Sequence, residues 1–282
     1  MREDFAVFIL SHGRPNNVMT INTLKKANYT GKWYIVVDNE DNTADEYIKN
    51  FGDKVLIFDK EKVAKTFDTA DTQKDRRTVV YARNVCFELA EQIGVTYFLE
   101  LDDDYNEFSY RKEIDGMLTQ RVNVKQADKM FSLMIDFLEQ TNSLTVAFGQ
   151  GGDFVGGLQS GLYKQGLKRK AMNTFFCSVN KPFKFVGRIN EDVNTYVLYG
   201  SRGELFFTIS DVMINQMTTQ ENKGGMTDIY IDSGTYLKSF YTVMMCPSCV
   251  KISRMGNKNM RIHHNITWDN AVPKILNEKW KK

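Results

Sequence analysis

The sequence predicts an α/β fold in which a mixed, mostly parallel sheet is flanked by helices. Apolar, β-prone runs alternate with segments of helical periodicity between residues 5 and 101, a pattern typical of parallel βαβ units. The fourth of these runs, Tyr97–Leu101, ends abruptly in three consecutive carboxylates. Further β-like runs follow in the second half, so we expect additional strands there.

The first four strands and their helices follow from hydrophobic spacing. Continuous apolar runs predict buried strands, whereas apolar side chains recurring every three or four residues predict helices. The predicted strands are residues 5–10, 33–37, 54–58 and 97–101. The predicted helices are residues 17–26, 45–51 and 79–93, and Gly94 is the stop signal of the last one. The polar segment 59–78 predicts a mobile loop.

The second half has a different organisation. Residues 126–140 predict a long helix, and residues 193–199 predict a shorter one that the Asn190 side chain could cap. Seven glycines between positions 149 and 166 predict a flexible loop. The β-like runs are residues 174–179, 204–209, 241–245 and 260–263. No cluster of proline or serine marks a linker near residue 150, so we expect a single domain over residues 1–282.

The composition is that of a globular protein and argues against several other classes. No apolar run reaches the roughly 20 residues needed to cross a bilayer, so no membrane association is expected. Acids follow Met1 where a signal peptide would have basic residues. The four cysteines are too few and too scattered for a disulfide framework, which favours a reducing cytoplasm. Cys246 and Cys249 form a lone C-x-x-C motif, which we interpret as a structural turn.

Charge is distributed unevenly along the chain. Residues 1–153 carry 19 basic against 26 acidic side chains, whereas residues 154–282 carry 18 against 9. The segment 154–190 holds seven basic side chains and no acid. Cations interleaved with aromatic rings suit the phosphates and stacked bases of a nucleic acid. The alternatives are a half-buried strand and a basic surface that balances an acidic one. The aromatic side chains concerned are Phe175, Phe176, Phe183 and Phe185.

The most informative stretch is the acidic triplet Asp102, Asp103 and Asp104. A buried strand that ends at residue 101 places the triplet at the carboxyl edge of the sheet, where open α/β folds bind ligands. Adjacent carboxylates repel one another unless a cation or hydrogen-bond donors neutralise them. Their oxygens suit Mg²⁺ or Mn²⁺, which typically bridge a protein carboxylate and substrate phosphates. The alternative is a solvated acidic loop.

Four motifs in sequence order resemble a known family. They are Phe8-Ile-Leu-Ser-His-Gly-Arg-Pro15, Trp33-Tyr-Ile-Val-Val-Asp-Asn39, Tyr81-Ala-Arg-Asn84 and Phe98-Leu-Glu-Leu-Asp-Asp-Asp104. Over about 105 residues the chain resembles the nucleotide-binding half of family-2-like GT-A glycosyltransferases. It also resembles the TET-associated glycosyltransferases of phages, which are linked to sugar transfer onto hydroxymethylated pyrimidines in DNA. The resemblance implies a GT-A, Rossmann-like fold with a nucleotide-sugar-binding half at residues 1–110 and an acceptor-binding half at residues 111–282.

The resemblance also implies roles for individual side chains. Asp104 and Asp102 would hold Mn²⁺ or Mg²⁺, and Asp102 would also lie near the ribose. A late histidine, His264 or His263, would complete the metal site; adjacent side chains of a strand face opposite sides, so only one of them can do so. Asp103 departs from the usual small or apolar middle residue of the Asp-x-Asp motif. The nucleotide of a UDP-sugar would contact Ser11, His12, Arg14, Asp38, Arg83, Asn84, Asp102 and Asp103. For Arg83 and Asp38, a surface arginine and a turn acid are the alternatives.

A second acidic pair, Glu191 and Asp192, resembles the element that supplies the general base of inverting GT-A enzymes. An acceptor hydroxyl has a high pKa, so a positioned carboxylate must take its proton as the new bond forms. The alternative is structural, because acids stabilise the first turn of a helix.

The leading hypothesis is a metal-dependent glycosyltransferase, a hexosyl- or pentosyltransferase of the cytoplasm, or of the host cytoplasm if the chain is phage-encoded. Its acceptor would be a hydroxymethylated pyrimidine in DNA, such as 5-hydroxymethylcytosine. One alternative is a GT-A enzyme acting on a glycan, a lipid-linked sugar or a protein. Another is a non-catalytic nucleic-acid-binding module with a degenerate GT-A core. The expected acceptor contacts are Lys168, Arg169, Lys170 and Lys184.

Overall fold

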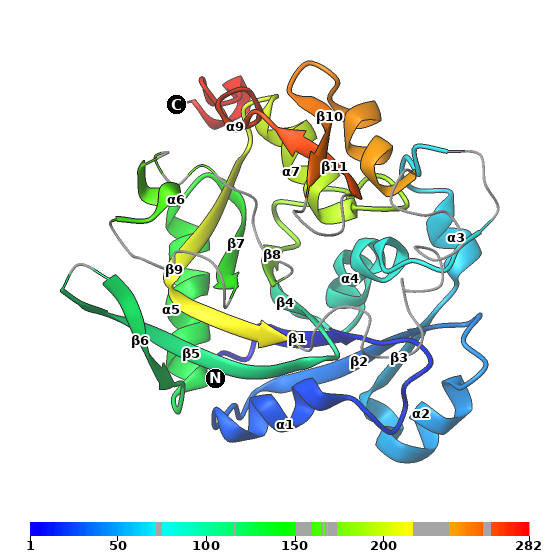
Figure 1. The fold of residues 1–282 in the computed structure, drawn as a ribbon. Coiled ribbons are helices and arrows are strands. Elements are labelled where there is room, and N and C mark those ends of the chain that lie inside the picture. The colour runs from blue at the N-terminus through cyan, green and yellow to red at the C-terminus, as the bar shows by residue number, and fades with distance from the viewer. Residues whose placement is uncertain are drawn as a thin grey trace.

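The computed structural model describes residues 1–71, 75–115, 117–150, 159–164, 166, 168, 174–216, 237–255 and 261–281. A mixed sheet of nine strands, in the order β3-β2-β1-β4-β8-β7-β9-β5-β6, forms its centre (Figure 1). Strands and helices alternate in the first half, as the sequence predicts.

Parallel strands form one side of this sheet. They are β1 (Phe5–Leu10), β2 (Lys32–Asp38), β3 (Val55–Phe58) and β4 (Tyr97–Asp102). β1 lies between β2 and β4, and each of its residues is buried, which is why its sequence is apolar throughout rather than alternating. β3, at the edge, is shorter and mostly half-buried. The four strands predicted for the first half are thus confirmed.

Antiparallel pairing dominates the other side. The strands there are β5 (Tyr105–Ile114), β6 (Met117–Asn123), β7 (Ser143–Gln150), β8 (Phe175–Ser178) and β9 (Leu205–Gln216). β8 is antiparallel to both β4 and β7, and it therefore joins the parallel strands to the rest of the sheet. β9 runs parallel to β7 but antiparallel to β5. The runs predicted at residues 174–179 and 204–209 correspond to β8 and β9, whereas β5, β6 and β7 were not predicted.

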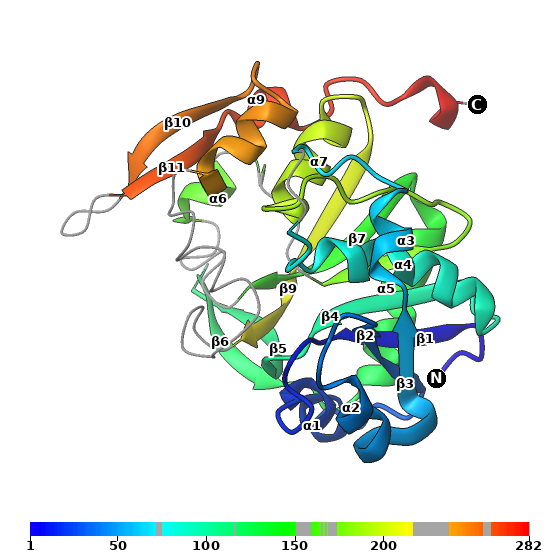
Figure 2. The same cartoon turned by 90° about the vertical axis from the view of Figure 1, so that its right-hand side faces the viewer.

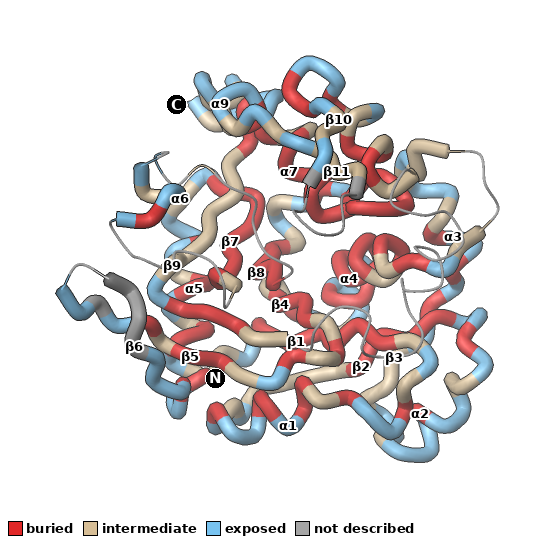
Figure 3. The backbone as a smooth tube through the Cα atoms, viewed as in Figure 1, coloured by how far each residue is buried: buried red, intermediate tan, exposed pale blue. Residues whose placement is uncertain are grey.

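Helices cover both faces of the sheet. They are α1 (Met19–Lys26), α2 (Ala44–Phe51), α3 (Lys60–Ala64), α4 (Val80–Gln92), α5 (Ala127–Gln140), α6 (Gly161–Lys164), α7 (Glu191–Gly200), residues 237–245 and α9 (Trp268–Ala271), with 3-10 turns at Gly52–Lys54 and Glu278–Trp280. Successive side chains of β1 point to opposite faces. Ala6 and Phe8 share a core with α4 and α7, whereas Val7 and Ile9 share a core with α1 and α5. Figure 3 shows the buried central strands between the partly exposed helices.

Three details differ from the sequence prediction. Residues 241–245 lie in a helix instead of a strand, because a short apolar run fits either structure. The polar segment 59–78 contains α3, and backbone hydrogen bonds from Gly187 to Asp68 (2.8 Å) and from Arg188 to Thr69 (2.9 Å) hold its described part. Asn190 precedes α7 with a φ of 58° and makes no side-chain capping bond.

A second, two-stranded antiparallel sheet lies outside the central one. It consists of β10 (Val250–Met255) and β11 (Arg261–Ile266), which corresponds to the run predicted at residues 260–263. Both views show it near α7 and at the opposite end of the molecule from α1 and α2 (Figure 2). Among the described residues, every helix is too short or too polar to cross a membrane.

The last residue of α7 has no room for a side chain. A Cβ atom on Gly200 would lie 2.2 Å from the backbone oxygen of Ala271 in α9. We therefore expect Gly200→Ala to lower the free energy of unfolding by about 1–3 kcal/mol, measured by urea denaturation. Gly161→Ala is the matched control, because a Cβ there meets no atom within 4 Å. Equal stability of the two variants would contradict the packing of α7 against α9.

Candidate active site

The carboxyl ends of three neighbouring parallel strands bring polar side chains together. Leu10 at the end of β1 is paired with Asp102 of β4, and the adjacent β2 ends at Asp38. The segment that follows β1 therefore lies next to both acidic ends. This confirms that the acidic triplet lies at the carboxyl edge of the sheet, which is where open α/β folds bind ligands.

The middle acid of the triplet points into the protein. Asp103 is 1% exposed; its carboxylate accepts a hydrogen bond from the Ser11 hydroxyl (2.5 Å) and pairs with Arg14 Nη2 (2.9 Å). The Ser11 hydroxyl in turn lies 2.6 Å from the Tyr47 hydroxyl of α2. Burial raises the pKa of Asp103 to about 6, although Arg14 opposes that rise. Three side chains predicted to contact the nucleotide (Ser11, Arg14 and Asp103) are therefore bonded to one another.

The outer acids of the triplet are the two that are partly exposed. The described part of the chain gives the Asp104 carboxylate no ion pair, and burial together with the charges of Asp102 and Asp103 raises its pKa to about 7. A divalent cation would remove this repulsion, and oxygen donors are what Mg²⁺ and Mn²⁺ require. The Asp102–Asp104 pair thus fits a metal ion. Asp103, the middle residue of the Asp-x-Asp motif, faces the interior. Only the two outer residues, Asp102 and Asp104, therefore have partly exposed carboxylates.

Asp38 is held between two cations. His12 Nδ1 lies 2.8 Å from its Oδ2 atom, and Lys60 Nζ lies 3.1 Å from its Oδ1 atom. Burial would raise the pKa of Asp38, but these partners hold it below its usual value. The hydrogen bond to Asp38 raises the pKa of His12. The sequence analysis predicted His12 and Asp38 as nucleotide ligands but missed the buried Lys60, whose position after a strand carries no local signal.

The guanidinium of Arg83 is buried at the centre of a cluster of acids. Its Nε donates to Glu191 (3.0 Å), its Nη2 donates to Asp102 (2.9 Å), and its Nη1 lies 3.5 Å from Glu100. The guanidinium carbon lies 5.3 Å from the ring centroid of Phe175. With only 1% of the side chain exposed, Arg83 is neither a surface arginine nor open to a phosphate. Arg83 makes internal ion pairs in this structure, and its predicted contact with the nucleotide stays a prediction.

Two glutamates face this arginine from different elements. Burial raises the pKa of Glu100 to about 8, and Arg83 only partly offsets that effect. Burial also raises the pKa of Glu191, the first residue of α7. The sequence analysis did not single out Glu100, although it carried a signal: a charged residue inside an otherwise apolar strand. Asp192 follows Glu191 in the first turn of α7 and is 8% exposed.

Asn84 has a structural position beside this cluster. Its side-chain amide donates to the backbone oxygen of Phe185 and accepts from the backbone nitrogen of the same residue, both at 2.9 Å. These two bonds fix the segment before α7 to α4. Its predicted contact with the nucleotide stays a prediction.

The histidine pair lies near the start of α7. The rings of His263 and His264 stack with their centroids 4.3 Å apart, and His264 Nδ1 lies 3.4 Å from the Asn190 side-chain nitrogen. Asn190 also donates to the backbone oxygen of Lys238 (2.6 Å). Among the described residues, no group of three or more histidine, cysteine or acidic side chains is arranged to hold a metal ion. The predicted role of His264 or His263 as a metal ligand stays a prediction.

Fewer side chains of the basic segment, residues 154–190, are free to contact a nucleic acid than the sequence suggests. Arg188 is buried and paired with Asp71 (2.9 Å), and Lys168 is paired with Asp269. Lys184 is exposed, whereas Arg169 and Lys170 lie outside the described residues. The predicted stacking of bases on aromatic side chains is wrong, because the four phenylalanines belong to the core. These are Phe175, Phe176, Phe183 and Phe185.

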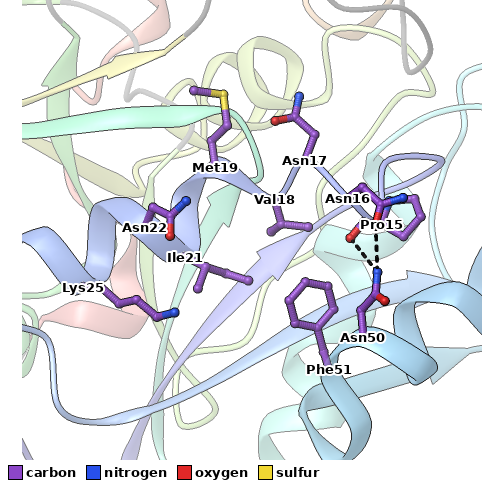
Figure 4. A pocket seen from close by; sticks show the side chains of 10 residues that line it. All are labelled: Pro15, Asn16, Asn17, Val18, Met19, Ile21, Asn22, Lys25, Asn50 and Phe51. Carbon is purple, nitrogen blue, oxygen red and sulfur yellow. Dashed lines mark hydrogen bonds between the residues drawn. The ribbon is translucent and has the colours of Figure 1, made fainter.

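A hollow of about 410 Å³ lies between the loop after β1, α1 and the end of α2 (Figure 4). The side chains of Val18 and Phe51 line it together with several asparagines. The Asn50 side-chain nitrogen donates to the backbone oxygen of Pro15 (3.3 Å) and to Asn16 (3.1 Å), which closes one end. None of the acids described above lines it.

Comparison with known proteins gives one family. A family model described as TET-Associated Glycosyltransferase matches residues 5–225. No curated protein matches the chain. Among solved structures, a mycobacterial protein is similar at 9% identity and a TM-score of 0.47, with 94% of this chain and 84% of that chain covered. Glucosyl-3-phosphoglycerate synthase from Mycobacterium tuberculosis, in complex with Mn²⁺, UDP and glucosyl-3-phosphoglycerate, is similar at 9% identity and a TM-score of 0.46, with 94% and 88% covered.

Removing the buried guanidinium of Arg83 should strongly lower the stability of the protein. Arg83→Met keeps an unbranched, mostly apolar stem but leaves Glu191, Asp102 and Glu100 without their shared cation. We expect a loss of about 3–5 kcal/mol in the free energy of unfolding, measured by urea denaturation. Arg76→Met, which breaks a partly exposed pair with Glu40, should cost less than about 1 kcal/mol. If the two variants lose the same amount, the network is not a stabilising one.

The pair of His12 and Asp38 predicts a pH dependence of stability. The pKa of His12 is raised in the folded protein, so its contribution is fully present below the unfolded value of about 6.5 and is lost as the pH rises through the folded value. Wild type should therefore exceed His12→Gln in unfolding free energy by more at pH 6 than at pH 9. Asp38→Asn should show the same reduced pH dependence as His12→Gln. A constant difference across this range would contradict the ion pair.

Proposed function

The chain belongs to the TET-associated glycosyltransferase family and is a glycosyltransferase, and we propose that it transfers a sugar from a nucleotide-sugar donor to a hydroxymethylated pyrimidine in DNA. The observation that carries the donor half of this proposal is the pair Asp102 and Asp104. Both are partly exposed at the carboxyl edge of β4, and Asp104 has no cationic partner among the described residues. A UDP-sugar is the donor we propose.

Asp102 and Asp104 would hold Mn²⁺ or Mg²⁺. The ion, when bound, supplies positive charge that stabilises the departing nucleoside diphosphate. The chain itself positions the two carboxylates: Arg83 holds Asp102 through Oδ1, and Asp103 fixes the turn through Ser11 and Arg14. His264 or His263, which lie near the start of α7, would supply the third protein ligand.

The nucleoside would lie over the ends of β1 and β2. His12 is 43% exposed at its side chain, and the hydrogen bond to Asp38, with the charges of Asp38 and Asp41, raises the pKa of its imidazole. The second ring nitrogen of His12 could donate a hydrogen bond to a carbonyl or phosphate oxygen of the donor. Asp38, 5% exposed and engaged by two cations, would act by orienting His12 instead of by contacting the base directly.

Asp192 is the general base that we propose. Its neighbour Glu191 is committed to Arg83 at 3.0 Å, so Glu191 is suited to positioning the start of α7. A carboxylate in the first turn of a helix is stabilised in its charged form, which leaves it ready to accept the proton of an acceptor hydroxyl.

The family description supports DNA as the acceptor. The basic segment, residues 154–190, supports it less, because few of its described cations are available to bind phosphates. Arg188 and the four phenylalanines are buried, so the described cations of this segment without an ion pair are Lys164, Lys181 and Lys184. Of these, Lys181 donates to the backbone oxygens of Leu138 (2.8 Å) and Thr141 (2.6 Å). A glycan, a lipid-linked sugar or a protein is therefore the second candidate acceptor. Both acceptors use the same donor chemistry.

One screen separates these acceptors. The protein is incubated with Mn²⁺ and a panel of nucleotide sugars, with 5-hydroxymethylcytosine DNA, unmodified DNA or a neutral glycan. We expect nucleoside diphosphate release to rise with hydroxymethylated DNA and the DNA to gain the mass of one sugar. Transfer to the glycan alone would move the proposal to the second candidate. Absence of donor turnover with every acceptor would overturn both.

Asp104→Asn should abolish sugar transfer and weaken nucleoside diphosphate binding in Mn²⁺. The substitution keeps the shape of the side chain but removes the charge that the metal ion requires. Calorimetric titration of UDP with and without Mn²⁺ measures the effect, and Asp53→Asn, at an exposed acid of the Gly52–Lys54 turn, is the control. Turnover equal to wild type at limiting Mn²⁺ would exclude Asp104 as a metal ligand.

Asp192→Asn should lower the rate of transfer by about 10²–10⁴-fold, the usual effect of losing a general base. The affinity for the nucleoside diphosphate should stay close to that of wild type, because Asp192 would act on the acceptor. Steady-state transfer rates and calorimetric titration measure the two quantities on the same preparation. Loss of donor affinity instead would assign Asp192 to the nucleotide pocket.

A further inference from the structure

Two cysteines outside the candidate active site face each other across a short turn. Cys246 follows the helix of residues 237–245, and Cys249 precedes β10 (orange in Figure 1). The Cys249 thiol donates to the Cys246 sulfur at 2.9 Å. Both side chains are buried, but Pro247 and Ser248 between them are exposed, so the turn lies at the surface.

The backbone of this turn already has a closed shape. The backbone nitrogens of Cys249 and Val250 both donate to the Cys246 oxygen, at 3.2 and 3.1 Å. A disulfide requires the sulfurs to approach to about 2.05 Å. The two atoms therefore need to move by less than about 1 Å, which side-chain torsions supply without refolding the turn.

The two thiols are chemically unequal. Burial acts to raise the pKa of Cys246, but hydrogen bonds with Cys249, Ser248 and Ser201 hold it below its usual value. Burial, together with the bond to Cys246, raises the pKa of Cys249 to about 12. A thiolate is the attacking species in disulfide exchange, so Cys246 is the better nucleophile of the pair.

A metal site is the other use of a C-x-x-C motif, and the surroundings do not support it. Zinc takes four ligands in structural sites and three protein ligands in catalytic ones. The described residues supply no third histidine, cysteine or acid near the two sulfurs. The pair is therefore suited to redox chemistry.

We propose that Cys246 and Cys249 form a thiol–disulfide exchange site whose oxidant is a low-molecular-weight disulfide. The Cys246 thiolate attacks one sulfur of the oxidant, forms a mixed disulfide and releases one thiolate. The Cys249 sulfur then loses its proton, attacks Cys246 and releases the second thiolate. The protein gives up two electrons and two protons, and the oxidant leaves as two thiols. This activity is independent of sugar transfer.

The position of the pair gives the disulfide a structural effect. The preceding helix contacts the candidate active site, because Asn190 donates to the Lys238 oxygen (2.6 Å). It also contacts β11, because the Ser239 hydroxyl donates to the Ile262 oxygen (3.0 Å). On the other side, the Thr267 nitrogen donates to the Cys249 oxygen (2.8 Å). A covalent bond between Cys246 and Cys249 would restrict the motion of this helix relative to the β10–β11 sheet.

The test exposes folded protein to glutathione buffers of increasing oxidised fraction, followed by alkylation and mass spectrometry of the cysteine peptides. We expect the peptide with Cys246 and Cys249 to lose two hydrogen atoms, while Cys86 and Cys177 remain alkylated thiols. These two are internal controls: both are buried, and their thiols donate to Ala82 (3.1 Å) and Thr145 (3.9 Å). Oxidation of all four cysteines together, or of none, would overturn the proposal.

Single serine variants test the order of attack. Cys249→Ser should accumulate glutathione on Cys246, and Cys246→Ser should react at least about tenfold more slowly. Equal rates would overturn the assignment of Cys246 as the nucleophile. Amide hydrogen exchange in residues 250–255 should slow when the wild-type pair is oxidised and stay unchanged in Cys249→Ser. Unchanged hydrogen exchange in oxidised wild type would contradict the proposed restriction of motion between the helix and the β10–β11 sheet.

Discussion

A single buried guanidinium is the constraint on which the candidate site depends. Arg83 comes from α4, and it pairs with acids of β4 and α7 that are up to 108 positions away in the sequence. Isolated carboxylates at these depths would be strongly disfavoured, and a shared cation with good geometry makes their burial tolerable. Phe175 and Phe185 border the guanidinium, so its remaining surface contacts aromatic rings rather than water. The same residue thus positions Asp102, which we propose on the donor side, and Glu191, next to the proposed general base.

Four acidic side chains at the end of β4 and in the turn after it lie in different environments. Glu100 and Asp102 lie on the same face, and both meet Arg83. Asp103 turns to the opposite side and pairs with Arg14, whereas Asp104 stays without a cationic partner among the described residues. A run of acids that looks uniform in sequence therefore holds two structural carboxylates, one shared carboxylate and one that is available. Burial raises the pKa of Glu100 to about 8, that of Asp103 to about 6 and that of Asp104 to about 7.

The sequence predicted the features that depend on a local pattern of residues. It missed those in which side chains far apart in the sequence come together in space. Apolar runs identified the four parallel strands, and the end of β4 located the acidic edge of the sheet. β5 was missed because polar and charged side chains interrupt its apolar residues. Residues 241–245 were mistaken for a strand because a short, mostly apolar run fits either a strand or a helix. No local pattern could indicate that Glu100, Asp102 and Glu191 meet one arginine. The sequence could not decide whether the aromatic rings near residues 175–185 stack on bases or belong to the core, because exposed and buried rings give the same pattern of basic and aromatic residues.

The order of strands has a consequence for how the protein is made. β4 and β5 are consecutive in the chain, but β8, β7 and β9 lie between them in the sheet. A nascent chain can pair β1 to β4 early, yet β5 gains its neighbour β9 only after residues 205–216 have left the ribosome. Until then β5 and β6 have an unpaired edge, and the closing step is a long-range one that folds slowly. Synthesis beyond residue 216 therefore sets the earliest moment at which the sheet can be complete, and a chain stalled before it would expose an edge prone to aggregation.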